Sequence, residues 1–231
     1  MTPEHKTVAR RSLLLKDCPP AIAEEVMARG TVRHVARGAT ILTPESRADD
    51  VFVVLSGWAK LFRITARGGE AVIDVLGPSR SLGEVAALRG ERYLVHAEAV
   101  TDCALLKIPA TAFNGLLGSC TEIRAALLAS TLHHLEALVG QVEALKVCSG
   151  AQRAAQFILS LVPDTCGRAC TVRLPYDKAL IAGQVGLSPE SLSRAFRRLR
   201  AEGVRVHRRE VRVDDVPALA AYAEFREAAW A

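Results

Sequence analysis

The chain has 231 residues, of which 50% are hydrophobic and 24% are charged, and its formal net charge is +5. A chain longer than the usual ~100 to 150 residues of one domain favours two domains, and its apolar content excludes a mainly disordered protein. Because its apolar runs are far shorter than the ~18 residues that cross a bilayer, and no secretory leader is visible, we expect a cytoplasmic protein without a membrane partner.

Residues 32–109 are predicted to form a β-domain. Short β-type runs alternate there with glycine and proline at turn positions, and a brief helical segment is expected at 82–88. The expected strands are 39–42, 51–55, 58–64, 71–76, 94–100 and 104–108. Such regular spacing is typical of a β-roll, a barrel or a sandwich, so we expect an N-terminal β-domain over residues 1–120.

Residues 121–147 are predicted to form one long helix without proline. Two parallel heptad stripes run along it, one from Leu128 to Val142 and the other from Leu127 to Leu145. Two stripes give a helix two faces to bury, so we expect one face to meet the same helix of a second copy in a two-fold dimer. A helix buried within one monomer is the alternative. The expected dimer contacts are Leu127, Leu128, Thr131, His134, Leu135, Leu138, Gln141, Val142 and Leu145.

The segment 177–199 carries the pattern of a helix-turn-helix. Its first helix stops at Gly186, where the missing side chain permits a tight turn, and Ser188 and Pro189 open the second helix as N-cap and first residue. A β-hairpin is expected to follow over 204–213. Helix pairs with a glycine turn are common, but turn, cap and following hairpin in this order indicate a winged helix-turn-helix.

The outer face of the second helix and the hairpin are rich in arginine. Residues 190–213 hold eight arginines against three glutamates, whereas a solvated charged face would interleave acids in similar number. Arginine can fork onto guanine in the major groove, a carboxylate can accept from cytosine, and a basic hairpin suits the phosphates. We therefore expect this part of the chain to bind double-stranded DNA. The expected DNA contacts are Ser188, Glu190, Ser191, Ser193, Arg194, Arg197, Arg198, Arg208 and Arg209.

In this order the motifs resemble the CRP/FNR family of transcription regulators. The resemblance lies in the segments 51–62 (VFVVLSGWAKLF) and 81–88 (SLGEVAAL), in the long helix and in the C-terminal domain. It implies an α+β protein with a cyclic-nucleotide-binding-like β-roll as sensor domain (1–120), a dimerisation helix and hinge (121–149) and a winged helix-turn-helix (150–231). It also implies RNA polymerase as a protein partner.

The second helix of the motif resembles one branch of that family. Glu190, Ser193 and Arg194 match the Glu-x-x-Ser-Arg signature of the FNR, FixK and DNR branch, which implies that they read the TTGAT-like half-sites of a palindrome. The segment 180–190 is particularly similar to the DNR type, regulators of denitrification that respond to nitric oxide through haem. The resemblance therefore implies nitric oxide as effector and haem as cofactor.

The effector region departs from the patterns for other ligands. Tyr93 and Leu94 stand where cyclic-nucleotide binders carry an Arg-Ser pair, with Arg92 one position away, so cyclic AMP would lack its charge-assisted partners and is not expected. Only Cys18 lies near the N-terminus, so an FNR-type iron-sulfur cluster is not expected either. The missing Arg-Ser pair and the apolar loop 85–88 also favour an alternative, in which the protein is a constitutive regulator whose β-roll is filled and binds no ligand. Haem needs an axial ligand in an apolar pocket, and the candidates are His34, His96, His133 and His134.

The cysteines and histidines do not form a metal or catalytic motif. Six dispersed cysteines are typical of a reducing compartment. Cys166 and Cys170 lack a nearby histidine or second cysteine pair for a zinc site, so we expect two free thiols, with a reversible disulfide as the alternative. Without clustered histidine and carboxylate ligands, a nucleophile motif or a phosphate-binding loop, an enzyme such as a cupin-like metal enzyme is not expected.

Overall fold

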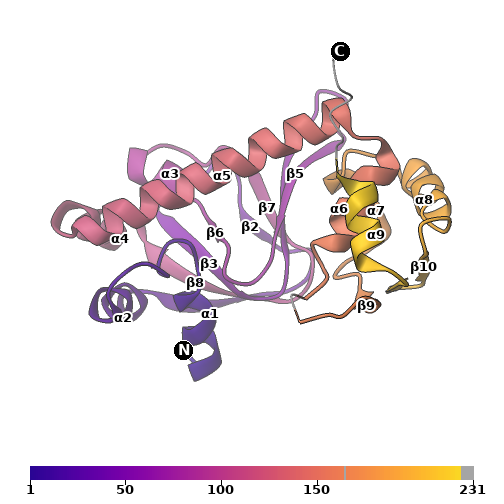
Figure 1. Cartoon of the computed structure of the whole chain (residues 1–231). Helices are drawn as coiled ribbons and strands as arrows, with labels where there is room; N and C mark the ends of the chain where they lie inside the picture. The colour runs from indigo at the N-terminus through magenta and orange to yellow at the C-terminus, as the bar shows by residue number, and fades with distance from the viewer. Residues whose placement is uncertain (164, 225–231) are drawn as a thin grey trace, which may run out of the picture. The chain divides into compact units, whose positions relative to one another are not determined.

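Two four-stranded antiparallel sheets form from the described residues of the N-terminal part of the chain (Figure 1). The computed structural model describes residues 1–163 and 165–224, and the chain divides into two units, 1–136 and 137–231. The strands of the first unit are β1 (Thr31–Val35), β2 (Thr40–Leu42), β3 (Asp50–Ser56), β4 (Ala59–Ile64), β5 (Glu70–Leu76), β6 (Ser81–Leu82), β7 (His96–Ala99) and β8 (Cys103–Pro109). One sheet has the order β1-β8-β3-β6 and the other β2-β7-β4-β5. The predicted β-domain is confirmed.

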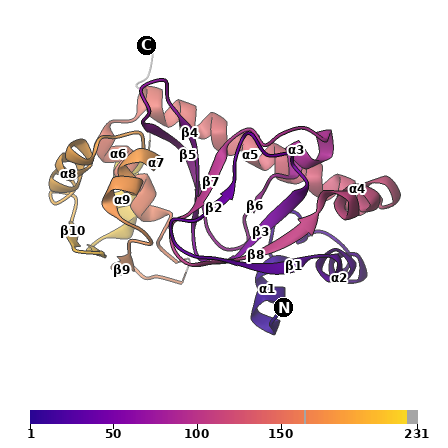
Figure 2. The same ribbon diagram turned by 180° about the vertical axis from the view of Figure 1, so that it is seen from behind.

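The strands β3 and β8 lie at the centre of the first sheet, beside β1 (Figure 2). All residues from Val51 to Leu55 are 3% exposed or less, because helices cover the sheet and neighbouring strands take the backbone hydrogen bonds. A continuous apolar run of this kind is typical of a strand buried on both faces. The helices that pack on β3 or β8 are α1 (Pro3–Arg10), α2 (Pro20–Arg29), α3 (Glu84–Arg89) and α4 (Ala110–Ser119).

The short helix α3 (Glu84–Arg89) begins after a turn that requires glycine. Gly83 has a φ of 90°, and a Cβ there would lie 3.0 Å from Tyr93 Cε1 and 3.2 Å from the Asp50 carbonyl oxygen. Any other residue would be strained by the left-handed backbone and crowded by these neighbours. The turn brings Glu84 into the interior of the first unit, where it is 3% exposed.

The long helix predicted from the sequence is α5 (Thr121–Val147). Its Ile123, Ala126 and Leu127 are buried in the core of the first unit. Another side of the helix carries an apolar stripe that is 50% to 61% exposed and that we call the open stripe. The open stripe consists of Leu128, Leu132, Leu135, Val139 and Val142.

Two residues expected at a dimer contact make contacts within the first unit: for Leu127 the prediction was wrong, and for His134 it stays a prediction. Leu127 is 7% exposed and packs in the core of the first unit, which leaves it no surface for a partner. His134 faces its own β-roll, with Nδ1 at 3.9 Å from Glu84 Oε1. Adjacent heptad stripes differ by only ~100° around a helix, so periodicity alone did not reveal which stripe meets the roll. The other expected contacts on α5 are exposed.

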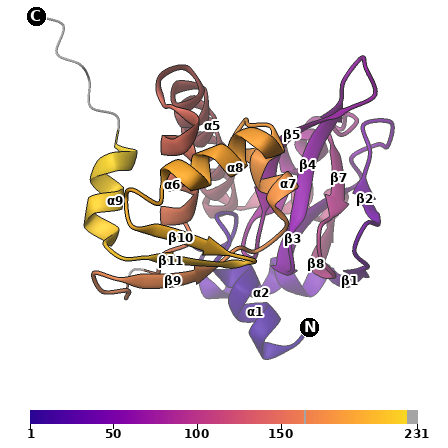
Figure 3. The ribbon, with the colours of Figure 1, turned by 90° about the vertical axis from the view of Figure 1, so that its right-hand side faces the viewer.

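The second unit has the arrangement of a winged helix-turn-helix (Figure 3). Its elements are α6 (Gly150–Leu159), β9 (Cys170–Arg173), α7 (Lys178–Gln184), α8 (Pro189–Arg198), β10 (Val204–His207), β11 (Glu210–Val213) and α9 (Val216–Ala223). The strands form a small sheet in the order β10-β11-β9, and α6 packs against α8 and α9. Ile158, Ile181 and Leu192 are at most 1% exposed in its core. None of the helices in the described ranges is both long and apolar enough to span a bilayer.

Cys166 and Cys170 are joined by a disulfide, with their Cα atoms 6.1 Å apart. The expectation of two free thiols was therefore wrong. The chain turns back before β9 and brings both thiols within bonding reach, a geometry that their spacing in the sequence does not reveal. The cysteines that remain free in the described structure are buried: Cys18, Cys103, Cys120 and Cys148.

Candidate nucleic-acid interface

The helix α8 follows α7 after a turn built on Gly186. This glycine has a φ of 65°, and a Cβ there would lie 2.5 Å from Leu145 Cδ2. Ser188 caps α8, because its Oγ accepts a hydrogen bond from the Ser191 backbone N–H at 3.2 Å, and Pro189 occupies the first turn. A cap of this kind stabilises a helix by ~1 kcal/mol. The predicted turn and cap are confirmed.

One face of α8 is apolar and the other is polar. Leu192, Ala195 and Phe196 are 7% exposed or less, and they hold the helix on the core of the second unit. Ser191 is half-buried, and the remaining polar residues predicted to contact DNA on α8 are exposed: Glu190, Ser193, Arg194, Arg197 and Arg198. A helix held by one face and polar on the other can be inserted into a groove of DNA.

Contacts within α8 orient two of the side chains predicted to read bases. Arg194 Nη2 donates to Ser191 Oγ at 2.7 Å. The pKa of Glu190 lies below its ordinary value, because its own backbone N–H and the Ser188 hydroxyl donate to the carboxylate and Arg194 attracts its charge. Glu190 is therefore an ionised acceptor at neutral pH, which is the state that accepts a hydrogen bond from the amino group of cytosine.

The acids that form ion pairs in the described part of the second unit engage arginines outside the set predicted to contact DNA. Among the described residues, Asp214 pairs with Arg205 and Arg212, and Asp215 pairs with Arg168. No ion pair in the described ranges engages the predicted DNA-contacting arginines, Arg194, Arg197, Arg198, Arg208 and Arg209. Their charges are thus available to phosphates and base edges.

The wing is a tight hairpin, and Arg208 and Arg209 form its tip. The strands β10 and β11 pair as far as His207 and Glu210, so only these two arginines remain in the turn. Arg208 has a φ of 52°, a left-handed conformation that costs a residue with a side chain roughly 1–2 kcal/mol. Such turns usually carry Gly, Asn or Asp. An arginine in this strained, exposed position indicates a functional role for its side chain.

A second polar group lies between the β-roll and α5 in the first unit, and sequence patterns missed most of it. Ser81 Oγ donates to Glu84 Oε1 at 2.9 Å, and His134 Nδ1 is 3.9 Å from the same oxygen. Arg80 Nη2 lies 3.6 Å from Asp74 Oδ2. Burial lowers the pKa of His134 by more than Glu84 raises it, so the imidazole is neutral at neutral pH and the contact is not an ion pair. Burial raises the pKa of Asp74.

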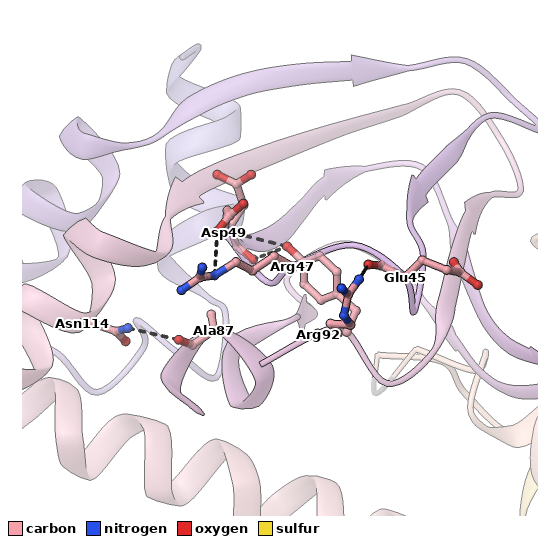
Figure 4. A network of polar contacts seen from close by, with 8 residues as sticks. Glu45, Arg47, Asp49, Ala87, Arg92 and Asn114 are labelled. Carbon is pink, nitrogen blue, oxygen red and sulfur yellow. Dashed lines mark hydrogen bonds and ion pairs between the residues drawn. The ribbon is translucent and has the colours of Figure 1, made fainter. Parts of the chain in front are cut away.

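The residues near the expected phosphate-binding position make contacts within the chain. Tyr93 is 6% exposed, and its hydroxyl donates to a backbone carbonyl of β3 at 2.7 Å. Arg92 is exposed and donates to the backbone carbonyl of Glu45 (Figure 4). In the same view Asn114 of α4 donates to the carbonyl of Ala87 in α3 at 3.1 Å. These bonds tie α3 and the loop after it to neighbouring segments.

The histidines predicted as haem ligands come from separate places in the first unit. His34 is exposed on β1 and lines a surface cavity of about 480 Å³ together with His5 and Asp102. His96 stacks on Phe62, with ring centroids 5.1 Å apart. His133 is exposed, and His134 is the histidine that faces the β-roll. The four histidines therefore do not form one site.

Comparison with known proteins matches both units. The sequence profile of the cyclic nucleotide-binding domain matches residues 32–120, and that of the Crp-like helix-turn-helix domain matches residues 152–222. The nitrogen fixation regulation protein FixK of Azorhizobium caulinodans is 27% identical over 185 residues, 78% of this chain and 73% of the relative. The cyclic AMP receptor protein of Thermus thermophilus is 30% identical over 158 residues, 67% of this chain and 69% of the relative.

Among solved structures, the chain is similar to a candidate cyclic nucleotide binding protein of Ruegeria pomeroyi. The two are 45% identical, the match covers 95% of this chain and 97% of the other, and the TM-score is 0.70. The chain combines a cyclic-nucleotide-type β-roll with a helix-turn-helix that has an exposed basic face. This combination defines a class of proteins, the DNA-binding transcription regulators, which are not enzymes. Within that class the chain belongs to the CRP/FNR family. The family and the domain order predicted from the sequence are confirmed.

Proposed function

We propose that the protein is a homodimeric regulator that recognises a palindrome with TTGAT-like half-sites. The observation that carries the proposal is the outer face of α8, where Glu190 is an ionised acceptor and Arg194 is held by Ser191 without a competing ion pair. This face combines a donor fork and an acceptor within one helical turn, which is the pairing that recognition of a G·C base pair requires.

Each TTGAT-like half-site contains one G·C pair, and we assign that pair to two side chains. Arg194 donates to guanine O6 and N7, and Glu190 accepts from the amino group of the paired cytosine. Ser193 donates to the Pro189 carbonyl at 3.0 Å, which leaves its oxygen free to accept from a neighbouring base. Arg208 and Arg209 contact phosphates, which positions the wing without selecting a sequence.

The open stripe of α5 supports the homodimer. Its five residues follow heptad spacing and are 50% to 61% exposed, and a contiguous apolar surface of this kind usually marks an interaction site. A second copy of α5 buries the stripe through a two-fold axis, as the commonest closed oligomers do. A two-fold protein matches a palindrome whose half-sites are one turn apart, ~34 Å. Family membership suggests RNA polymerase as a further partner.

DNA titrations by fluorescence anisotropy test the proposal. The protein should bind a TTGAT palindrome ~10³-fold or more tightly than a scrambled duplex of the same length. Arg194→Ala should lose ~1–3 kcal/mol for each half-site of the palindrome and little on the scrambled duplex, because only the palindrome presents guanine in register. Arg200→Ala, which removes an exposed arginine just beyond α8, is the matched control. Equal losses on both duplexes for Arg194→Ala would reject the assignment.

The contact between His134 and Glu84 supports a sensor function, because it joins α5 to α3 and the β-roll. Haem and nitric oxide remain predictions. The candidate histidines lie apart, so none of them is singled out as an axial ligand. A filled, ligandless β-roll remains the alternative, supported by the buried Tyr93. An absorption spectrum of protein purified without oxygen, with added haem, separates the two: a Soret band shifted by nitric oxide supports the sensor, and no haem uptake supports the ligandless roll.

A further inference from the structure

The disulfide Cys166–Cys170 lies in the DNA-binding unit, just before β9. The cysteine usage of the chain predicts a reducing compartment, where disulfides are usually transient, catalytic or redox-sensing. The free cysteines of the described structure are buried, which limits their reaction with solutes. Among the cysteines of the described structure, Cys166 is therefore the one most open to thiol chemistry.

The two residues of this disulfide differ in exposure. Cys166 is half-buried and lines an open surface cavity of about 600 Å³ together with Arg168 and Asp215. Cys170 is 6% exposed. Arg168 and Asp215 form an ion pair at the cavity, and the side chain of Arg168 is 82% exposed. A small thiol from solution can therefore reach the sulfur of Cys166.

The disulfide loop is bonded to the start of α9. The Val216 N–H donates to the Arg168 carbonyl at 2.7 Å, and the Arg168 guanidinium donates twice to Asp215 Oδ2, at 2.9 and 2.7 Å. Asp215 in turn caps α9, since its Oδ1 accepts from the Ala218 N–H at 3.1 Å. The position of the loop is thus coupled to the first turn of the last helix.

The same disulfide anchors the strand that supports the wing. Cys170 is the first residue of β9 and pairs with Val213 of β11. The pairing continues to Arg173 and Glu210, next to the wing tip, and the Leu174 N–H donates to the Arg209 carbonyl at 2.7 Å. Since β9 is the strand on which β11 rests, a looser start of β9 gives the wing tip more freedom.

We infer that the Cys166–Cys170 disulfide is a site of thiol-disulfide exchange with small dithiols, and that its reduction weakens DNA binding by loosening the wing. A thiolate of the dithiol attacks Cys166 Sγ, a mixed disulfide forms, and the electron pair of the broken S–S bond goes to Cys170 Sγ, which takes up a proton. The second thiol then attacks the mixed disulfide and releases Cys166 as a thiol. The protein gains two electrons, and the dithiol leaves as a cyclic disulfide.

The inference rests on DNA contact by the wing and predicts a loss that does not depend on sequence. Reduction should weaken binding to the palindrome and to a scrambled duplex alike, by roughly threefold to tenfold, because phosphate contacts carry the wing's share of affinity. A loss confined to the palindrome would instead place the effect on α8 and overturn the inference.

The test compares full-length protein before and after dithiothreitol, with thiols blocked by alkylation and the crosslink measured by mass spectrometry. We expect a crosslinked 166–170 peptide in the untreated protein and weaker DNA binding after reduction. Cys166→Ser/Cys170→Ser should bind like the reduced protein and ignore the reductant. Cys148→Ser, which changes a cysteine outside the disulfide, should keep the response. Equal affinities in both redox states, or no crosslink in protein purified in air, would overturn the inference.

Amide hydrogen exchange supplies a second readout that does not need variants or DNA. Reduction should speed exchange in β9 and in the hairpin β10–β11, and leave β3 unchanged. If the protein failed to bind DNA in either state while this change occurred, the proposed function would fail and the redox site would stand. If reduction changed neither the amide exchange nor the DNA affinity, the inference of a redox site would be overturned.

Discussion

Arg208 at the wing tip has a strained backbone, so replacing it separates its effect on folding stability from its effect on DNA binding. Glycine should relieve the left-handed strain, so we expect the free energy of unfolding of Arg208→Gly to be unchanged or up to ~1 kcal/mol higher. DNA affinity should fall on all sequences, and the slope of log affinity against log salt should shrink by about two, which is about one for each copy in the dimer. Urea unfolding and titrations over a salt series measure the two effects. A variant with full DNA affinity would show that Arg208 contacts no phosphate.

His134 predicts how stability depends on pH. Its pKa is lowered in the folded protein, so the unfolded chain binds more protons below the ordinary value near 6.5. The free energy of unfolding should therefore fall as the pH drops below about 6.5 and stay level above it. Urea unfolding at pH 7.5 and 5.5 measures the difference, which should shrink in His134→Gln. His207→Gln, at an exposed histidine of β10 that does not neighbour His134 in the sequence, is the control and should behave like the unaltered protein.

A single charged residue in the open stripe of α5 should disrupt the proposed dimer contact. Leu135 is 56% exposed near the middle of the stripe, so lysine there should leave the monomer folded and prevent a second copy from packing. We expect Leu135→Lys to sediment as a monomer and to lose at least ~10-fold in affinity for the palindrome. Ala129→Lys adds the same charge about 100° around the helix from Leu128 and should remain dimeric. If both variants sedimented like the unaltered protein, the stripe would not be the dimer contact.

The elements predicted from the sequence are those with a strong local signal. The heptad spacing of α5, the apolar run of β3 and the cap at Ser188 each lie within one segment, and each was found where expected. The helices α1, α2, α4 and α9 were not predicted. They are short, and in α1 only Ala9 is buried, so contacts with other elements rather than their own periodicity place them.

At the scale of the whole molecule, the sequence located the polar face of α8 but not the contacts that join distant segments. Glu84 and His134 are fifty residues apart, and no periodicity encodes their approach. The disulfide could not be predicted either, because it depends on how the chain turns before β9. The domain boundaries at both ends of α5 stay predictions. The two compact units of the structure meet inside that helix, after Glu136, and the first part of α5 buries residues up to Ser130 in the first unit.

The open stripe has a consequence for how the regulator responds to its own abundance. If two copies must pair through α5 before both half-sites are occupied, dilute protein is mostly unpaired and inactive. Promoter occupancy then rises with about the square of the total amount of chain, so a doubling of synthesis gives up to about a fourfold increase. A gene under its control would therefore switch over a narrower range of regulator dosage than one read by a monomer.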